Sequence, residues 1–314
     1  MEERILRFYL KVFSFLSIFL IYFFYLFLVR EINIKNNFFI IKKNENYINI
    51  INNNITDNDF NLFFYKLALR TILSIKNEIH FGKFLIKNNS TYYQILKTIV
   101  LPSNFYNKIT IVEGWTKNNL NIILSQNFTN FFELDYNKII ADTYMLNDGS
   151  SFFQFKKLLD KRFLLIKSKF KEHPMSKKYS FDEILVIASL LEKEGIDYED
   201  KRKIYSVIMN RLKLNMKLQI DATVIFSLTG GKSDLKRKLT YADLKIDNSY
   251  NTYKNYGLPP GPISYVGYKT IELILEDYKT DYLFYFYNSF ENNHIFSLNY
   301  KDHLKRLNEY RSKK

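Results

Sequence analysis

The chain has 314 residues, with 46 lysine and arginine residues against 32 aspartate and glutamate residues, a formal net charge of +14. This length predicts one or two globular domains, and the absence of cysteine excludes disulfides, thiolate catalysis and cysteine-based metal sites. A basic balance is compatible with nucleic acid, anionic lipid or an anionic polymer as partner, although frequent Asn, Lys, Ile, Phe and Tyr indicate that compositional bias contributes to it.

The first predicted element is a spanning helix over Val12–Val29, an uncharged run of about 18 residues. Arg4, Arg7 and Lys11 precede it, so the N-terminus is expected to stay in the cytoplasm and the rest to be exported. A cleaved signal peptide is the alternative, but its apolar region is normally shorter and ends in small residues. We expect residues 1–30 to form a cytoplasmic tip and a single-pass anchor in the cytoplasmic membrane. An exported location also makes nucleic acid an unexpected partner.

Residues 31–150 are expected to form an exported N-terminal region, with a helix around Phe60–Ile75. Within it, a small unit at about residues 81–126 alternates strands and helices. Its predicted elements are Lys83–Ile86, a helix capped by Ser90 or Thr91 that runs to Val100, Ile109–Val112 and a helix over Thr116–Leu124. A basic amphipathic segment over Phe152–Lys171 then predicts a linking helix within residues 151–178.

The last region, residues 179–314, opens with a helix that carries two glutamates at its end. Ser180 and Glu183 form a capping box, and Gly195 is a residue type common just beyond a helix. The helix is apolar around most of its circumference, which predicts burial. The residues one turn and two turns before Glu194 are large and apolar, whereas those before Glu192 are smaller and more polar. A carboxyl group against leucines should have a raised pKa, which suits a general acid; capping of the last turn is the alternative for both glutamates.

Two further segments stand out. Gly257–Ile263 contains three of the 5 prolines and two of the 9 glycines of the chain, which predicts a fixed, non-repetitive backbone. Ser249–Tyr253 lies just before it. Near the C-terminus, Asp281–Tyr287 and His294–Ser297 predict a β-hairpin.

An ordered series of motifs joins these features. It consists of Glu192-Lys193-Glu194, Asn210-Arg211-Leu212, Leu218-Gln219-Ile220-Asp221, Ser249-Tyr250-Asn251-Thr252-Tyr253 and Gly257-Leu258-Pro259-Pro260-Gly261-Pro262-Ile263. The series resembles the endolytic murein transglycosylase (YceG-like) family over about residues 182–307. A weaker likeness over Phe81–Leu124 resembles the LysM-like module of that family. The resemblance implies an α+β fold: a transmembrane helix, a small LysM-like βα module and a mixed α+β catalytic domain of the YceG-like type.

The resemblance implies a lyase that cleaves the β-1,4 bond after N-acetylmuramic acid inside peptidoglycan strands and leaves 1,6-anhydro ends. Glu194 matches the catalytic glutamate of the family, with Glu192 as the runner-up. No cofactor or metal is expected, and peptidoglycan synthases are possible partners. His294 and His303 match histidines common in the family, for which a structural or substrate-adjacent role is expected.

The implied substrate-binding residues offer short polar groups for sugar hydroxyls and acetamides, or rings and backbone for the wall of a glycan groove. They are Asn210, Arg211, Gln219, Asp221, Ser249, Tyr250, Asn251, Thr252, Tyr253, Pro259 and Pro260. Arg211 could instead form a structural ion pair, and Asp221 could be a second carboxylate. The chain departs from the family pattern at Ile220 and Ala222, where Thr and Pro are usual, and at Gly195, where Thr is common. A non-catalytic peptidoglycan-binding scaffold and a hydrolase therefore remain as alternatives.

Overall fold

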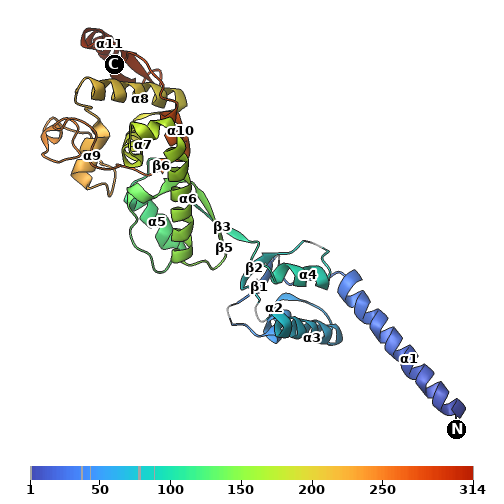
Figure 1. Ribbon diagram of the computed structural model, residues 1–314. Coiled ribbons are helices and arrows are strands. Elements are labelled where there is room, and N and C mark those ends of the chain that lie inside the picture. Colours follow the sequence, from blue (N-terminus) through green and yellow to red (C-terminus); the bar gives the residue numbers. More distant parts are fainter. Residues whose placement is uncertain (1, 37, 43, 77–78, 88, 314) are drawn as a thin grey trace. The chain divides into compact units, whose positions relative to one another are not determined.

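The computed structural model describes residues 2–36, 38–42, 44–76, 79–87 and 89–313 (Figure 1). The chain divides into two compact units. The first consists of Met1–Asn107 and Met145–Ser150, and the second of Lys108–Tyr144 and Ser151–Lys314. The paired strands β3 (Tyr106–Thr110) and β5 (Thr143–Asn147) carry the chain from one unit to the other.

The first unit packs helices against the antiparallel pair of β1 and β2. Its elements are α1 (Glu2–Phe24), the π-helical turn η1 (Tyr25–Val29), β1 (Phe38–Ile41), α2 (Tyr47–Asn54), α3 (Asp59–Lys76), β2 (Gly82–Leu85) and α4 (Tyr92–Ile99). Its core is rich in aromatic side chains: Phe39, Tyr65, Phe84 and Tyr92 are fully buried. The rings of Tyr65 and Tyr92 stack at 4.5 Å. The helix predicted around residues 60–75 and the strand predicted at 83–86 agree with α3 and β2.

The N-terminal helix is apolar, as predicted. Within the part of the chain that the structure describes, one helical stretch is long and apolar enough to cross a membrane: Glu3–Val29. Its last turn joins the first unit, because Leu26 is buried and the ring of Phe27 contacts that of Tyr92 edge-on at 5.1 Å. Arg30, the residue after this helical stretch, forms an ion pair with Asp57 at 2.9 Å.

The second unit is a mixed α+β body. Its elements are α5 (Lys117–Asn127), η2 (Tyr136–Lys138), β4 (Ile140–Ala141), α6 (Phe152–Glu172), η3 (Pro174–Lys177), α7 (Phe181–Glu194), α8 (Tyr198–Lys213), α9 (Asp221–Thr229), η4 (Asp243–Lys245), β6 (Val266–Gly267), α10 (Tyr268–Leu275), β7 (Phe284–Asn288), β8 (Asn293–Ser297) and α11 (Tyr300–Ser312). β4 and β6 pair in parallel, and β7 and β8 form the predicted hairpin.

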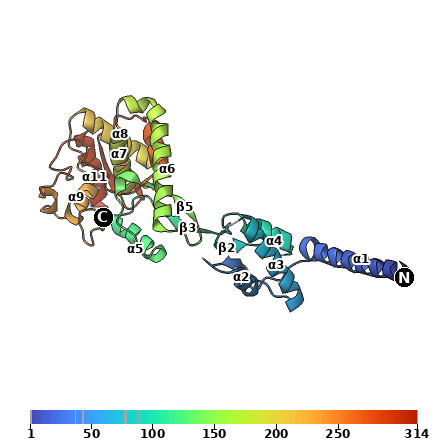
Figure 2. The ribbon, with the colours of Figure 1, turned by 60° about the horizontal axis from the view of Figure 1, so that its bottom comes forward.

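Helix α7 is the centre of this unit. It contacts α6, α8, α9, α10 and β6, and both views show it beside α8 (Figures 1 and 2). Its side chains Ile184, Ile187 and Leu190 are fully buried in the main hydrophobic core. This enclosure explains why α7 is apolar around most of its circumference.

Two boundaries differ from the sequence-based expectation. The strand predicted at Ile109–Val112 is displaced towards the N-terminus, because pairing with β5 defines β3 and the chain turns at Gly114, where φ is 77°. The segment 81–126, expected as one module, contributes β2 and α4 to the first unit and α5 to the second. The predicted linking helix is α6, which belongs to the second unit and packs against α7.

Candidate active site

Helix α7 places two glutamates at its C-terminal end. It begins with the predicted capping box: Ser180 accepts a hydrogen bond from the backbone N–H of Glu183 at 3.2 Å, and the Glu183 carboxylate accepts one from the backbone N–H of Ser180 at 2.7 Å. Every residue from Ile184 to Leu191 is buried. After Ile184 the helix therefore leaves the core only at its last turn, where Glu192 and Glu194 lie.

Gly195 ends α7 for a different reason from the one that the sequence indicates. Its φ is −85°, so the left-handed conformation that favours glycine after a helix is not used. A β-carbon at this position would overlap Cγ of Lys201 and would lie 3.2 Å from the carbonyl oxygen of Leu191. Glycine is needed here because Lys201 passes close to the end of the helix.

The carboxyl group of Glu194 lies in a half-buried setting between several elements. The hydroxyl of Tyr285, on β7, donates a hydrogen bond to its Oε2 atom at 3.1 Å. Burial, and after it the negative charge of Asp221, raise the pKa of Glu194 above its ordinary value of 4.5, while hydrogen bonds from Tyr285 and the backbone of Ala222 and the proximity of His294 oppose this shift. A raised carboxyl pKa suits a general acid near neutral pH, in agreement with the expectation from helix geometry.

Glu192 has a different environment. Its side chain is only 2% exposed and forms an ion pair with Lys201, on α8. Its Oε1 atom also accepts a hydrogen bond from the backbone N–H of Gly267 at 3.1 Å. These contacts join α7 to α8 and β6. Glu192 thus has a structural role in the described contacts, which leaves Glu194 as the stronger candidate for proton transfer.

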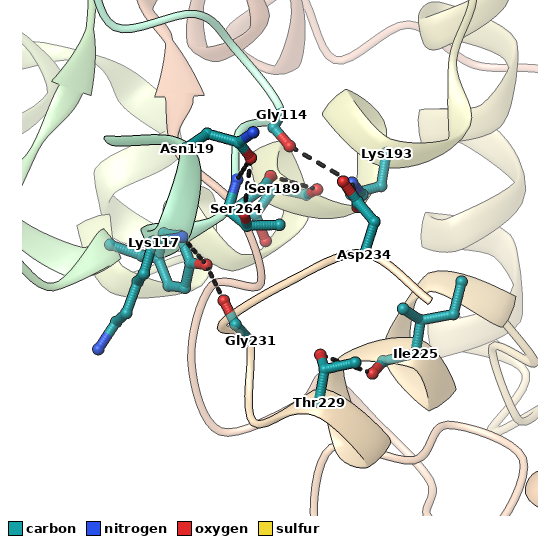
Figure 3. A network of polar contacts seen from close by, with 12 residues as sticks. Gly114, Lys117, Asn119, Ser189, Lys193, Ile225, Thr229, Gly231, Asp234 and Ser264 are labelled. Carbon is teal, nitrogen blue, oxygen red and sulfur yellow. Dashed lines mark hydrogen bonds and ion pairs between the residues drawn. The ribbon is translucent and has the colours of Figure 1, made fainter. Parts of the chain in front are cut away.

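Lys193, between the two glutamates, belongs to a separate polar network (Figure 3). Its Nζ atom donates to the carbonyl oxygen of Gly114 at 3.4 Å and lies 3.2 Å from Oδ1 of Asp234. On the same helix, the carbonyl oxygen of Ser189 accepts a hydrogen bond from the hydroxyl of Ser264 at 3.2 Å. The network fastens the end of α7 to the turn at Gly114 and to the segment before β6.

The turn before α9 is held in an unusual conformation. Gln219 has a φ of 53°, which a non-glycine residue rarely adopts. Thr252 fixes this turn from the opposite side: its carbonyl oxygen accepts from the N–H of Gln219 at 3.2 Å, and its hydroxyl accepts from the N–H of Ile220 at 2.9 Å. The hydroxyl of Thr223 lies 2.9 Å from that of Thr252. These bonds set the position of Asp221, the first residue of α9.

The side chains of Tyr253 and Asp221 are joined by a hydrogen bond next to this turn. The Tyr253 hydroxyl donates to Oδ1 of Asp221 at 2.6 Å, and the Asp221 carboxylate is exposed to solvent. Asn251, by contrast, is fully buried. Its side-chain amide donates to the carbonyl oxygens of Leu244 and Ile246 at 3.1 and 2.8 Å. Asn251 therefore shapes the loop that presents Tyr253.

The segment Gly257–Ile263, here called the Pro-Gly segment, packs against the loop that contains Tyr250. The ring of Tyr250 lies 4.4 Å from that of Phe226, and a β-carbon at Gly261 would lie 2.9 Å from the Tyr250 hydroxyl. Pro259 is buried and Pro260 is exposed. The glycine at position 261 therefore allows the segment to lie close to Tyr250, as expected of a fixed backbone.

Asn210 and Arg211 bond to the backbone rather than to acidic side chains. The amide of Asn210 donates to two carbonyl oxygens just before β7. Arg211 is 7% exposed, and its guanidinium donates to the carbonyl oxygens of Leu283 at 2.7 Å and Leu218 at 2.6 Å. Both side chains bond α8 to the segment just before β7, the strand that carries Tyr285. Asn210 and Arg211 therefore have a structural role in these contacts.

The two C-terminal histidines lie in different surroundings. Nδ1 of His294 is 2.8 Å from Oδ2 of Asp200, and the His294 ring meets that of Tyr285 edge-on at 5.4 Å. His303 packs against Phe284 at 5.3 Å, and burial lowers its pKa. Of the two histidines, His294 is therefore the one that contacts Tyr285, the hydrogen-bond partner of Glu194.

The structure thus joins Tyr285 to Glu194 and Tyr253 to Asp221 by hydrogen bonds, and it places the His294 ring against that of Tyr285. Sequence reasoning missed Tyr285 because the run 284–287 is aromatic at every position, so alternation does not show which rings face the site. Of the remaining candidates, Gln219 and Ser249 are exposed and Thr252 is buried. Among the residues that the structure describes, no group of three or more His, Cys, Asp or Glu side chains could hold a metal ion.

Comparison with known proteins places this site in a family. Residues 40–309 match the sequence model of the YceG-like family. Since the match covers most of the chain, the protein belongs to the YceG-like family, as the motif series predicts. The crystal structure of a yceG-like protein from Listeria monocytogenes has the same fold, with a TM-score of 0.55 at 22% identity over 87% of this chain and 99% of that one.

Two curated relatives match a shorter stretch of the chain at higher identity. The endolytic murein transglycosylase of Bacillus subtilis strain 168 is 41% identical over 145 residues, which are 46% of this chain and 39% of the relative. That of Streptococcus pneumoniae serotype 2 is 34% identical over 140 residues, which are 43% of this chain and 25% of the relative. The chain therefore matches well under half of the length of either relative.

Proposed function

We propose that the protein is a peptidoglycan lytic transglycosylase, a lyase that cleaves the β-1,4 bond between N-acetylmuramic acid and N-acetylglucosamine inside nascent glycan strands. Membership of the YceG-like family and the names of its two relatives support this reaction. The observation that carries the proposal is the half-buried Glu194 carboxyl group, whose pKa is raised by burial. Glycosidic cleavage requires such an acid near neutral pH.

A single carboxyl group can perform both proton transfers. Protonated Glu194 donates its proton to the glycosidic oxygen while the bond from the muramyl C1 to that oxygen breaks. The Glu194 carboxylate then accepts the proton of the muramyl C6 hydroxyl while O6 bonds to C1. The products are a 1,6-anhydro end and a free C4 hydroxyl, and water is not consumed. The hydrogen bond from Tyr285 supports the first step, because it stabilises the carboxylate that this step creates.

Closure by the internal hydroxyl must be faster than attack by water. Holding C6 and C1 in one geometry provides this advantage through proximity. We assign the holding to the substrate-binding residues that the sequence predicts. Asp221 and Tyr253, joined by a hydrogen bond, and the exposed Gln219 and Ser249 offer polar groups on the turn before α9 and on the loop before Gly257. Tyr250 and the segment Gly257–Ile263 would form a wall of the glycan groove.

The location of the enzyme is a further part of the proposal. The apolar helix Glu3–Val29 would anchor the protein in the cytoplasmic membrane, with the N-terminus in the cytoplasm and the catalytic region outside. Residues 31–150 would lie outside the membrane, residues 151–178 would link them to the rest of the chain, and residues 179–314 would act on the glycan. Cleavage of new strands at the membrane would terminate their elongation, with peptidoglycan synthases as partners.

Product analysis tests the reaction. The full chain in detergent is incubated with uncrosslinked glycan strands, and the new ends are identified by mass spectrometry. We expect 1,6-anhydro-muramyl ends that disappear in Glu194→Gln and persist in folded Glu192→Gln. Reducing ends would identify a hydrolase instead. Intact strands that bind to the wild-type protein would identify a non-catalytic scaffold.

A further inference from the structure

Helix α3 of the first unit has an exposed apolar face. Phe60, Phe63 and Leu67 are 58%, 60% and 46% exposed, and their spacing of three and four residues places them on one side of the helix. On the opposite side, Tyr65 and Leu69 are fully buried in the core of the unit. Large apolar side chains that are exposed next to one another mark an interaction surface, so this face indicates a partner.

The start of α3 lies against the C-terminal end of the apolar helical stretch Glu3–Val29. The ring of Phe64 lies 5.5 Å from that of Phe19. The ring of Phe60 lies 6.0 Å from that of Tyr22. Because Phe60 belongs to the exposed face of α3 and also contacts the stretch, the apolar face of α3 continues the exposed apolar surface of the stretch.

Polar contacts hold α3 in this place. The hydroxyl of Tyr22, within the stretch, donates to Oδ1 of the buried Asn61 at 2.7 Å. The Asn61 amide in turn donates to Oδ1 of Asp57 at 2.9 Å. The same Asp57 oxygen accepts a hydrogen bond from Arg30, the residue that follows the stretch. The start of α3 is therefore bonded to the stretch directly at Tyr22 and, through Asp57, just beyond its end.

We propose that the apolar face of α3 lies in the surface of the lipid bilayer beside the spanning helix, as a second contact of the protein with the membrane. The inference rests on the membrane anchoring proposed above. An interfacial helix buries its apolar face at the boundary between headgroups and acyl chains, where aromatic side chains are enriched. The sequence of α3 contains one acidic residue, Asp59, and three basic residues that would attract anionic headgroups: Lys66, Arg70 and Lys76.

This second contact has a consequence for the orientation of the first unit. The tilt of a spanning helix is not set by its length, but by packing and by anchors at the membrane interface. A helix that is bonded to the spanning helix and also lies in the interface is such an anchor. α3 would therefore fix the tilt of the first unit relative to the membrane.

Spin labels distinguish lipid from water around α3. The chain contains no cysteine, so Phe63→Cys and Leu67→Cys each take one nitroxide label in the full chain, reconstituted in vesicles of phosphatidylcholine and phosphatidylglycerol. Electron paramagnetic resonance measures label collisions with oxygen, which concentrates in the bilayer, and with a water-soluble nickel chelate. We expect the oxygen-to-nickel ratio at both positions to exceed that at Leu85→Cys severalfold. Leu85 is the matched control, because it is 56% exposed on β2 of the same unit.

A label at Phe15→Cys, an exposed position in the apolar stretch, distinguishes failure of this proposal from failure of the anchoring. Ratios at 63 and 67 as low as at 85, with a high ratio at 15, would overturn the proposal and leave the anchoring in place. Few collisions with either reagent at 63 and 67 would show that protein covers the face, and would also overturn it. A low ratio at 15 would refute the anchoring and this inference together. Thermal unfolding of each labelled variant checks its fold, and the readout does not depend on glycan cleavage.

Discussion

The hydroxyl of Tyr285 donates a hydrogen bond to Oε2 of Glu194 at 3.1 Å, across 91 residues of sequence. It stabilises the ionised carboxylate, whereas burial and the charge of Asp221 stabilise the protonated form. Glu194 is therefore placed between opposing influences. A group that must first donate and then accept a proton needs such a balance, because neither form can be strongly favoured.

Replacing Tyr285 by Phe should slow cleavage. A hydrogen bond to a charged group contributes about 1.5–3 kcal/mol, which corresponds to roughly a 10- to 100-fold lower rate. The alkaline limb of the pH–rate profile should move to higher pH, since the pKa of Glu194 loses an influence that lowers it. Tyr287→Phe is the control on the same strand, because its hydroxyl bonds to Asn292 instead. Equal rates in Tyr285→Phe and wild type would show that the bond has no part in the reaction.

The pair of Glu192 and Lys201 should support stability more than chemistry. Lys201→Met leaves the Glu192 carboxylate, 2% exposed, without its cation, and breaking a buried pair costs about 3–5 kcal/mol. Urea unfolding of the second unit should show this loss. The double variant Glu192→Gln/Lys201→Met should recover part of it, because no unpaired charge remains buried. A double variant less stable than Lys201→Met would contradict this account.

The raised pKa of Glu194 predicts a pH dependence of stability. The native state binds a proton at Glu194 more tightly than the unfolded chain does, so the free energy of unfolding should fall as pH rises from about 4.5 through the folded-state pKa. Glu194→Gln cannot ionise and should lack this contribution. Unfolding curves of both proteins at a series of pH values measure the difference. Parallel curves would show that burial does not perturb Glu194.

A side chain at position 195 should destabilise the protein, because the end of α7 leaves no space for a β-carbon there. In Gly195→Ala the added methyl group meets Lys201 and the carbonyl oxygen of Leu191, and overpacking typically costs about 1–3 kcal/mol. The backbone itself is not strained, since φ is −85°. Adding Lys201→Ala should make the combined loss smaller than the sum of the single losses. Full additivity would place the strain elsewhere.

The sequence predicts Glu194 because its neighbours on the helix face are local. Ile187, Leu190 and Leu191 lie one and two turns before it, and helical spacing alone puts them on one side. The capping box at Ser180 likewise fixes the start of α7 from four adjacent residues. Helices α3 to α7 and the C-terminal hairpin were predicted for the same reason, since caps, periodicity and turns are short-range signals, whereas α2 and α8 to α11 were not predicted.

The contacts of the site are long-range, and the sequence does not predict them. Ser189 lies in an apolar run, yet its hydroxyl accepts a hydrogen bond from the N–H of Ile263 at 3.0 Å and so anchors the Pro-Gly segment to α7. The pairing of Glu192 with Lys201 depends on how the chain reverses after Gly195. Tyr285 reaches Glu194 from a strand whose preceding residue, Leu283, accepts a hydrogen bond from Arg211 of α8. Such contacts follow from tertiary packing rather than from local pattern.

The reaction run in 18O-labelled water tests the central claim most directly, which is that Glu194 transfers the proton of the C6 hydroxyl while O6, not water, bonds to C1. With uncrosslinked glycan strands, we predict new 1,6-anhydro ends without 18O in the wild-type protein, and none in Glu194→Gln. Reducing ends that carry 18O would show that water attacks C1 and would contradict the account. So would unchanged anhydro products from folded Glu194→Gln.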